Sequence, residues 1–179
     1  KKWQEKIKFL NREELKKVAQ SPLVEIACHT HDSHKAVLLN EYGNTTASMV
    51  THQYFKNSGF HESTTEYQQR IYQDLKQSSD ILYELLGKRP KVMVWPYGKY
   101  TKFAIEEAEK VGLTEFFTLD EEYISVDEKR NIGRFLMSGN PPESTFKYFD
   151  KVNFNFTSQL RILEVDVNNV FRNDQERQK

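Results

Sequence analysis

Three of the five histidines in this 179-residue chain, His29, His31 and His34, lie close together in the sequence. Neutral imidazole is a common ligand for divalent metals, because one ring nitrogen can bind the ion while the other keeps its proton. Positions five apart point about 140° apart on a helix and to opposite faces of a strand. His29 and His34 can therefore meet at one ion only if the chain turns between them. Asp32-Ser33 is suitable turn sequence, so this stretch predicts a metal site.

More than one pair of these histidines could bind the ion. His29 with His31 would also fit one face of a continued strand, so spacing alone leaves two pairs open. A turn through Asp32-Ser33 would send His31 elsewhere, and we expect His29 and His34 to bind and His31 not to. Cys28 could add a thiolate, but a small apolar strand residue is the role that we favour for a single cysteine.

The elements that must position these residues alternate between helices and strands. A capping box at Asn11–Glu14 predicts a helix that ends before Pro22, and the apolar run 23–28 predicts a buried strand. Further along we expect helices over 66–86 and 102–111 and after Pro141, and strands over 91–95, 115–119 and 132–137. Such alternation is typical of a parallel α/β sheet or barrel. Region 36–65 keeps no period and is expected to be a long, ordered loop.

Functional sites of parallel sheets form on the loops that follow the carboxyl ends of the strands. The histidine turn, the segment Trp95-Pro96-Tyr97-Gly98 and Asp120 each follow an expected strand. We therefore expect these three groups to lie along one edge of the sheet.

Composition limits the classes of function. Lys and Arg (26) balance Asp and Glu (26), so bulk charge indicates neither a nucleic-acid nor a membrane-surface partner. No apolar run approaches the ~20 residues of a membrane span. Both ends fall within polar runs, and we interpret the chain as part of something longer. We predict a domain boundary near Thr157, with 158–179 forming a linker and the first strand of a following domain.

Two segments, 25–34 and 89–98, resemble the polysaccharide deacetylases of carbohydrate esterase family four, the NodB-like enzymes. The five-residue spacing of His29 and His34, and the loop around Gly43, are similar to the branch that N-deacetylates poly-β-1,6-N-acetyl-D-glucosamine in biofilm exopolysaccharide systems. This resemblance implies α/β structure, as part of a deformed (β/α) barrel whose N-terminal part is missing. It also implies that 158–179 begins a glycosidase-like domain, and that the protein is periplasmic or outer-membrane-associated and works with other exopolysaccharide export components.

The resemblance also implies a site. His29 and His34 would bind one divalent metal ion (Zn, Co, Ni or Fe), with a third ligand from an Asp-Asp pair whose other member is the general base. The general acid would be a histidine. The chain contains no Asp-Asp pair and no histidine after His61. We therefore expect the base and the acid upstream of Lys1, and no activity from this chain alone.

The Trp95-Pro96-Tyr97 segment would complete the site on the substrate side. By the resemblance, the backbone N–H of Tyr97 is an oxyanion donor, and Trp95, Pro96 and Tyr97 contact the sugar. A strand aromatic packed in the core is the other interpretation of Trp95, and the residues alone leave it open.

The expected function is metal-dependent N-deacetylation of poly-β-1,6-N-acetyl-D-glucosamine, with this N-acetylglucosamine polymer as the partner. One alternative is a deacetylase of another N-acetylated glycan, chitin-like or from peptidoglycan. The loop around Gly43 and the histidine spacing favour the first substrate. A second alternative is a non-catalytic carbohydrate-binding domain, which absence of an Asp-Asp pair from the full-length gene would favour.

Overall fold

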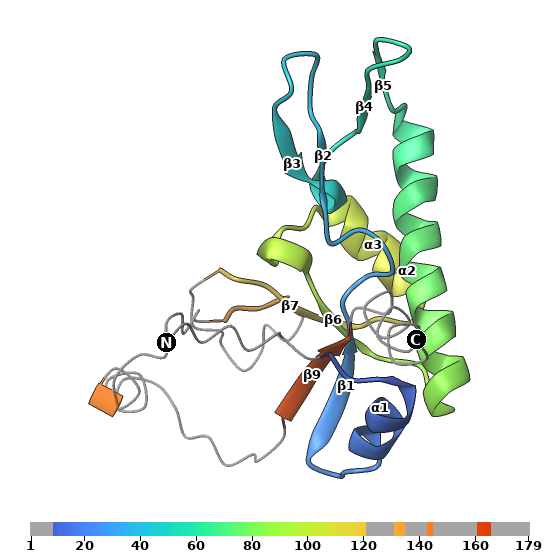
Figure 1. The fold of residues 1–179 in the computed structure, drawn as a ribbon, viewed down its shortest axis with the longest axis vertical. Helices are drawn as coiled ribbons and strands as arrows, with labels where there is room; N and C mark the ends of the chain where they lie inside the picture. Colours follow the sequence, from blue (N-terminus) through green and yellow to red (C-terminus); the bar gives the residue numbers. More distant parts are fainter. Residues whose placement is uncertain (1–8, 121–130, 135–142, 145–160, 166–179) are drawn as a thin grey trace, which may run out of the picture.

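The fold was obtained as a computed structural model, which describes residues 9–120, 131–134, 143–144 and 161–165 (Figure 1). Its centre is a five-stranded sheet in the order β8-β7-β6-β1-β9. The strands are β1 (Val24–Cys28), β6 (Val92–Val94), β7 (Glu115–Phe117), β8 (Asn131–Ile132) and β9 (Arg161–Val165). Every pairing in this sheet is parallel, so the prediction of a parallel α/β fold is confirmed.

Within the described ranges, the sheet is accompanied by the α-helices α1 (Arg12–Ala19), α2 (Thr64–Leu86) and α3 (Lys102–Lys110). The predicted capping box at Asn11 is present, and Thr101 caps α3 through its side chain. Helix α2 begins two residues earlier than expected, because Ser63 and Glu66 form a second capping box. It ends at Gly87, whose φ of 74° gives the left-handed C-cap that glycine adopts without strain. Among the described residues, no helix is long and apolar enough to span a bilayer.

The main core fills the space between the sheet and the helices. One face of β1 contributes Ile26 and Cys28 to it, while Ala27 faces the other side, as the two-residue period of a strand requires. Helix α2 contributes apolar side chains at helical spacing: Ile71, Leu75 and Leu82. This packing holds α2 against β1, the strand that leads directly into the histidine turn.

Region 36–65, expected as one long ordered loop, contains two short antiparallel hairpins. They pair β2 (Ala36–Leu38) with β3 (Thr45–Ala47), and β4 (Tyr54–Phe55) with β5 (Phe60–His61), and a 3-10 turn, η1 (Ser48–Val50), follows β3. Figure 1 shows both hairpins projecting together beside the N-terminal end of α2. Strands of two or three residues are too short to show a period in the sequence, which is why the hairpins were not predicted.

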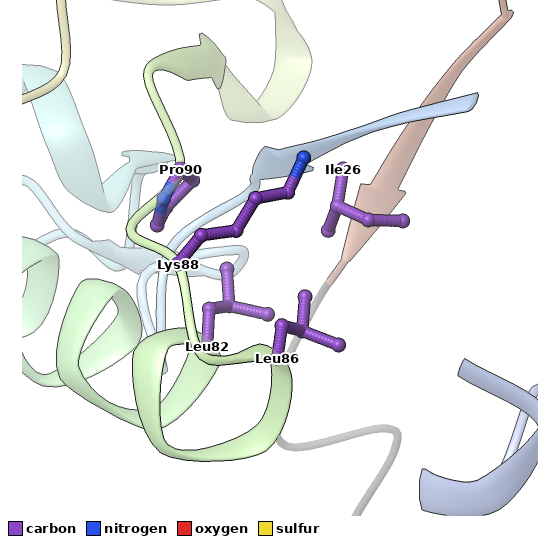
Figure 2. Close-up of a pocket in the computed structure, with 5 residues that line it drawn as sticks. All are labelled: Ile26, Leu82, Leu86, Lys88 and Pro90. Atoms are coloured by element: carbon purple, nitrogen blue, oxygen red, sulfur yellow. The ribbon is translucent and has the colours of Figure 1, made fainter. Parts of the chain in front are cut away.

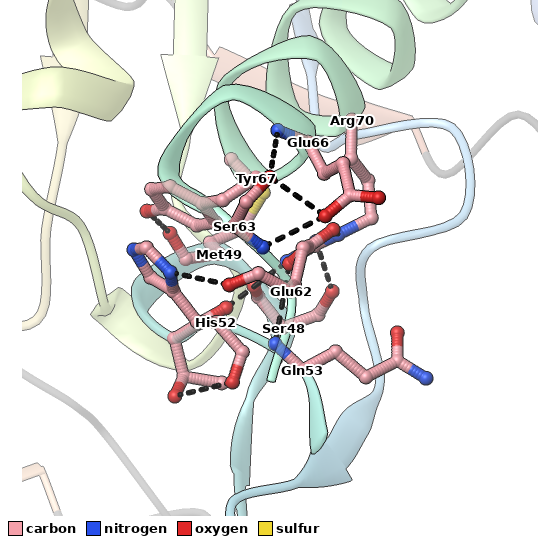
Figure 3. A network of polar contacts seen from close by, with 10 residues as sticks. Ser48, Met49, His52, Gln53, Glu62, Ser63, Glu66, Tyr67 and Arg70 are labelled. Carbon is pink, nitrogen blue, oxygen red and sulfur yellow. Dashed lines mark hydrogen bonds and ion pairs between the residues drawn. The ribbon is translucent and has the colours of Figure 1, made fainter. Parts of the chain in front are cut away.

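A network around Arg70 joins the base of the hairpins to α2 (Figure 3). The Arg70 guanidinium donates to both carboxylate oxygens of Glu62, each at 2.8 Å. It also donates to the backbone oxygens of Ser48 and Thr51, at 3.2 and 3.0 Å. The Arg70 side chain on α2 therefore bonds the segment that connects the two hairpins, at Ser48 and Thr51, and also Glu62, which follows the second hairpin.

Strand β9 comes from a distant part of the sequence. β9 pairs with the whole of β1, from Val24 opposite Arg161 to Cys28 opposite Val165. The sequence predicted this segment as the first strand of a following domain, whereas here it is an edge strand of the same sheet. The boundary near Thr157, the helix start at Pro141 and the end of the strand predicted over 132–137 lie outside the described residues. The domain division therefore stays a prediction.

Candidate metal centre

The histidine turn begins where β1 ends. His29 is only 8% exposed, and its Nδ1 lies 2.7 Å from the backbone oxygen of Val94 at the end of the neighbouring strand β6. A carbonyl oxygen can only accept, so Nδ1 carries the proton and Nε2 carries the lone pair. Metal-binding histidines are commonly oriented in this way, by donation from their other nitrogen to a backbone carbonyl. The geometry of His29 therefore fits that of a metal ligand.

His34 meets His29 across the turn. The centroids of the two rings lie 4.7 Å apart, with their planes at 84°. The chain thus reverses between them, as the Asp32-Ser33 sequence predicted, and the structure brings together the pair that we expected. Within the described part of the chain, no group of three or more His, Cys, Asp or Glu side chains could hold a metal. Metal binding and the third ligand therefore stay predictions.

A buried carboxylate on α2, which the sequence did not single out, supports this turn. Asp74 is 9% exposed and accepts hydrogen bonds from the backbone N–H of His31 (3.1 Å) and of Asp32 (2.7 Å). Burial raises the pKa of Asp74 above its ordinary value, and hydrogen bonds from Asp32, His31 and Ser33 act in the opposite direction. The signal in the sequence was an acidic residue between Ile71 and Leu75, on the apolar face of a helix.

Trp95 follows β6, and its side chain is completely buried. Its ring stacks on the rings of Phe116, at a centroid distance of 5.7 Å, and of Tyr100, at 6.0 Å. This is the core position that the sequence left open as an alternative. A direct contact between Trp95 and a sugar stays a prediction, and this arrangement does not favour it.

The next three residues form a tight turn, η2 (Pro96–Gly98), in which Tyr97 and Gly98 both have positive φ, of 56° and 65°. A Cβ on Gly98 would lie 2.5 Å from the Cβ of Leu119 and 2.7 Å from its backbone nitrogen, so only glycine fits there. Pro96 is buried, whereas Tyr97 is 49% exposed. The Tyr97 ring lies 4.7 Å from the His34 ring, so the rings of His29, His34 and Tyr97 follow one another at this edge.

Cys28 and Asp120 take no part in the contact between the two histidine rings. Cys28 is fully buried and donates to Ser78 Oγ at 3.1 Å, and burial raises the pKa of its thiol to about 11. It is therefore a protonated core residue at neutral pH, as favoured, and a poor metal ligand. Asp120 follows β7 and accepts a hydrogen bond from the Tyr100 hydroxyl at 3.2 Å.

A shallow apolar pocket lies elsewhere, with an empty volume of about 160 Å³ that includes open solvent (Figure 2). Its lining residues are Ile26, Leu82, Leu86, Lys88 and Pro90. Pro90 precedes β6, so the pocket lies toward the amino-terminal ends of the strands, away from the histidine turn. It offers one cation and no converging polar groups, and we assign it no function.

A parallel α/β sheet with a pair of histidines at its carboxyl edge is the arrangement expected from the family resemblance. Residues 2–116 match the polysaccharide deacetylase family, and the chain belongs to this family. Over 163 residues the chain is 32% identical to the poly-β-1,6-N-acetyl-D-glucosamine N-deacetylase of Escherichia coli strain K12. That match covers 91% of this chain and 24% of the relative.

Solved structures agree with this assignment. A de-N-acetylase from Aggregatibacter actinomycetemcomitans is 36% identical, with a TM-score of 0.73 over 79% of this chain and 53% of the other. The BpsB deacetylase domain from Bordetella bronchiseptica is 35% identical, with a TM-score of 0.68 over 70% of this chain and 48% of that domain. These similarities confirm the fold class. The chain spans about a quarter of the length of the curated relative and about half of each solved chain.

Proposed function

We propose that this chain supplies the metal-binding histidines of a hydrolase that removes acetyl groups from poly-β-1,6-N-acetyl-D-glucosamine. The observation that carries the proposal is the convergence of His29 and His34 beside Tyr97, at the carboxyl edge of a deacetylase-family sheet. The name of the Escherichia coli relative supports the choice of substrate. From the resemblance, we also propose a periplasmic or outer-membrane location and a role in exopolysaccharide export and biofilm formation.

In this proposal, His29 and His34 hold one divalent ion through their imidazole nitrogens. Such an ion supplies polarisation of the amide carbonyl and lowers the pKa of a bound water. The Val94 carbonyl contributes by fixing the proton of His29 on Nδ1, which leaves the lone pair on Nε2. The third ligand, the general base and the general acid are assigned to protein outside this chain.

The turn η2 supplies the oxyanion donor in this proposal. The N–H groups of Gly98 and Lys99 already donate to the carbonyls of Trp95 and Pro96, at 2.9 and 3.0 Å. The Tyr97 N–H is the amide that the family resemblance assigns to the developing oxyanion. A rigid donor of this kind stabilises the transition state because it needs no reorganisation during the reaction.

Acetate release by the purified full-length protein tests the proposal. Oligomers of β-1,6-linked N-acetylglucosamine and chitin oligomers of the same length are offered with metal, after chelation, and after metal is restored. We expect acetate from the β-1,6 oligomers, loss of activity on chelation and recovery with a divalent ion. A His34→Ala variant serves as the inactive control.

Other outcomes identify the alternatives. Faster release from chitin oligomers, or from peptidoglycan fragments, would assign the enzyme to a different N-acetylated glycan. Binding of the oligomers without acetate release under any metal condition would indicate a carbohydrate-binding domain.

A further inference from the structure

Among the residues that the structure describes, one side chain from another element holds the loop between the two candidate metal ligands. Asp74, in the middle of α2, accepts from the backbone N–H groups of His31 and Asp32 and interacts with the Ser33 side chain. We propose that Asp74 is a positioning residue, which holds the turn in the shape that places His34 against His29. The inference rests on the proposed metal centre and adds a residue to it.

Helix α2 bonds both the end of β1 and the turn that follows it, from two positions four residues apart. One turn after Asp74, the Ser78 hydroxyl accepts from the Cys28 thiol at 3.1 Å. Positions four apart lie on the same face of a helix, so Asp74 and Ser78 both face the end of β1 and the start of the turn. The buried neighbours Ile71 and Leu75 pack α2 into the core. Asp74 thus bonds the turn to a rigid element.

The turn requires such support because its backbone is strained. Thr30 has a φ of 72°, in the left-handed region that is unfavourable for a β-branched residue. Its Oγ1 is buried and has no hydrogen-bond partner among the residues that the structure describes. The next two residues donate their N–H groups to the two carboxyl oxygens of Asp74, at 3.1 and 2.7 Å. These bonds offset the cost of the strained residue that precedes them.

The two histidines depend on Asp74 to different degrees. His29 has its own hydrogen bond to Val94, on the neighbouring strand. His34 follows the turn and reaches His29 only if residues 30–33 keep their path. Loss of Asp74 should therefore displace His34 relative to His29 and weaken metal binding, while the rest of the fold persists.

The test is Asp74→Asn in the full-length protein, with Asp80→Asn as the matched control. Asn keeps the shape of the side chain but leaves a single acceptor oxygen for two backbone N–H groups. Asp80 lies on the same helix and pairs with Lys76 and Arg89, away from the turn. Zinc affinity is measured by competition with a chelating dye, the visible spectrum of the Co²⁺-loaded protein reports ligand geometry, and thermal unfolding reports the fold.

We expect zinc affinity to fall by about 10- to 100-fold in Asp74→Asn, as is typical when a residue that orients metal ligands is lost. The Co²⁺ spectrum should change in this variant, and Asp80→Asn should match the wild type in both measurements. Equal zinc affinity and an unchanged spectrum in Asp74→Asn would overturn the inference and leave the metal centre intact. Failure of the wild type to bind zinc or Co²⁺ would overturn the metal centre and the inference together.

A second variant covers the case in which Asp74→Asn does not fold. Ser33→Ala removes one interaction with Asp74 and leaves the carboxylate and both backbone bonds in place. It should lower zinc affinity in the same direction by a smaller factor. An unchanged affinity in a folded Ser33→Ala protein, with Asp74→Asn unfolded, would count against a positioning role and for a structural one.

Discussion

At the scale of single residues, the three rings at the edge of the sheet are held in different ways. His29 is buried and bonded to Val94, whereas Tyr97 is half exposed and lies in a backbone conformation that few side chains adopt. His34 lies between them and contacts both rings. Substitutions at these positions should therefore separate loss of metal from loss of catalysis.

The first prediction concerns the three clustered histidines. His29→Ala and His34→Ala should each remove most of the bound metal, because each deletes one of the two proposed ligands. His31→Ala should leave metal content nearly unchanged, since His31 supports the turn through its backbone N–H, which alanine retains. Metal per protein is measured by elemental analysis after dialysis. Equal loss from all three variants would contradict the assignment.

The second prediction concerns Gly98. Gly98→Ala should lower the free energy of unfolding by more than the ~1–2 kcal/mol of a left-handed alanine, because the new Cβ overlaps Leu119. Gly43→Ala is the control, since Gly43 also has a positive φ, of 86°, but nothing within 4 Å of a Cβ. Chemical denaturation measures both. Equal losses would show that the Leu119 contact is unimportant.

The third prediction separates the phenol of Tyr97 from its backbone. The Tyr97 hydroxyl is 3.5 Å from the His34 oxygen, at the outer limit of a hydrogen bond, so it contributes little. Tyr97→Phe in the full-length enzyme should keep most of kcat, because the backbone donor survives. Pro96→Ala should reduce kcat more, since the fixed φ of Pro96 helps to set the direction of the following peptide, which carries the Tyr97 N–H. A fall of about 100- to 1,000-fold in Tyr97→Phe would mean that the phenol contacts the substrate.

At the scale of elements, α2 has two tasks at two different places. Near its middle it supports the histidine turn through Asp74, and one turn earlier it bonds the hairpins through Arg70 (Figure 3). Beside that network, His52 stacks on Tyr67 at 4.8 Å and lies 2.8 Å from the Glu62 carbonyl. Polar contacts with this one helix therefore hold the segment between the hairpins, and Glu62 is the carboxylate among them.

The fourth prediction follows from Glu62. Burial alone would raise its pKa, but hydrogen bonds from Arg70 and from the Gln53 N–H hold the pKa below its ordinary value of 4.5. A lowered pKa in the folded state means that Glu62 contributes full stability above about pH 4.5, and that this contribution is lost as pH falls through the folded value. Glu62→Gln should be destabilised by roughly 1–3 kcal/mol at pH 7 and should lose less on acidification.

The control for Glu62 is Glu106→Gln, on the exposed face of α3, where Lys102 lies 4.0 Å away. An exposed pair of this kind contributes no more than about 1 kcal/mol. Unfolding by urea between pH 3 and 7 measures all three proteins. An acid response in Glu62→Gln as steep as that of the wild type would show that Glu62 is not the group that titrates.

At the scale of the whole molecule, the pairing of β1 with β9 joins two distant parts of the sequence in one sheet. β9 pairs with the full length of β1, and it comes from the far end of the sequence. The histidine pair follows β1 directly.

The fifth prediction is that the purified 179-residue chain releases no acetate from poly-N-acetylglucosamine, even with divalent metal present. The reason is chemical, because the sequence contains no Asp-Asp pair to supply the third ligand and the general base. Acetate is measured enzymatically, with a full-length deacetylase as the positive control. Metal-dependent release by the chain would assign the base to a carboxylate within it, with Asp120 as the first residue to substitute.

The sequence by itself determined the local features of this protein. The capping box at Asn11, the stop at Gly87, the strand before the histidines and the turn through Asp32-Ser33 each depend on residues a few positions apart, which a single sequence displays. The family followed from two such local segments. The proximity of His29 and His34 could also be predicted, because Asp32-Ser33 is turn sequence and a turn is what allows that spacing to converge, although spacing alone left His29 with His31 open.

The tertiary structure alone decided the rest. Asp74 lies 43 residues from the His31 amide that it holds, and no periodicity in the sequence links the two. The sequence allowed Trp95 to be a core or a surface aromatic. In the structure its ring is buried and stacks on those of Phe116 and Tyr100. The place of β9 beside β1 likewise depends on contacts between distant parts of the chain. Such contacts are set by packing in space, which local propensity and spacing do not encode.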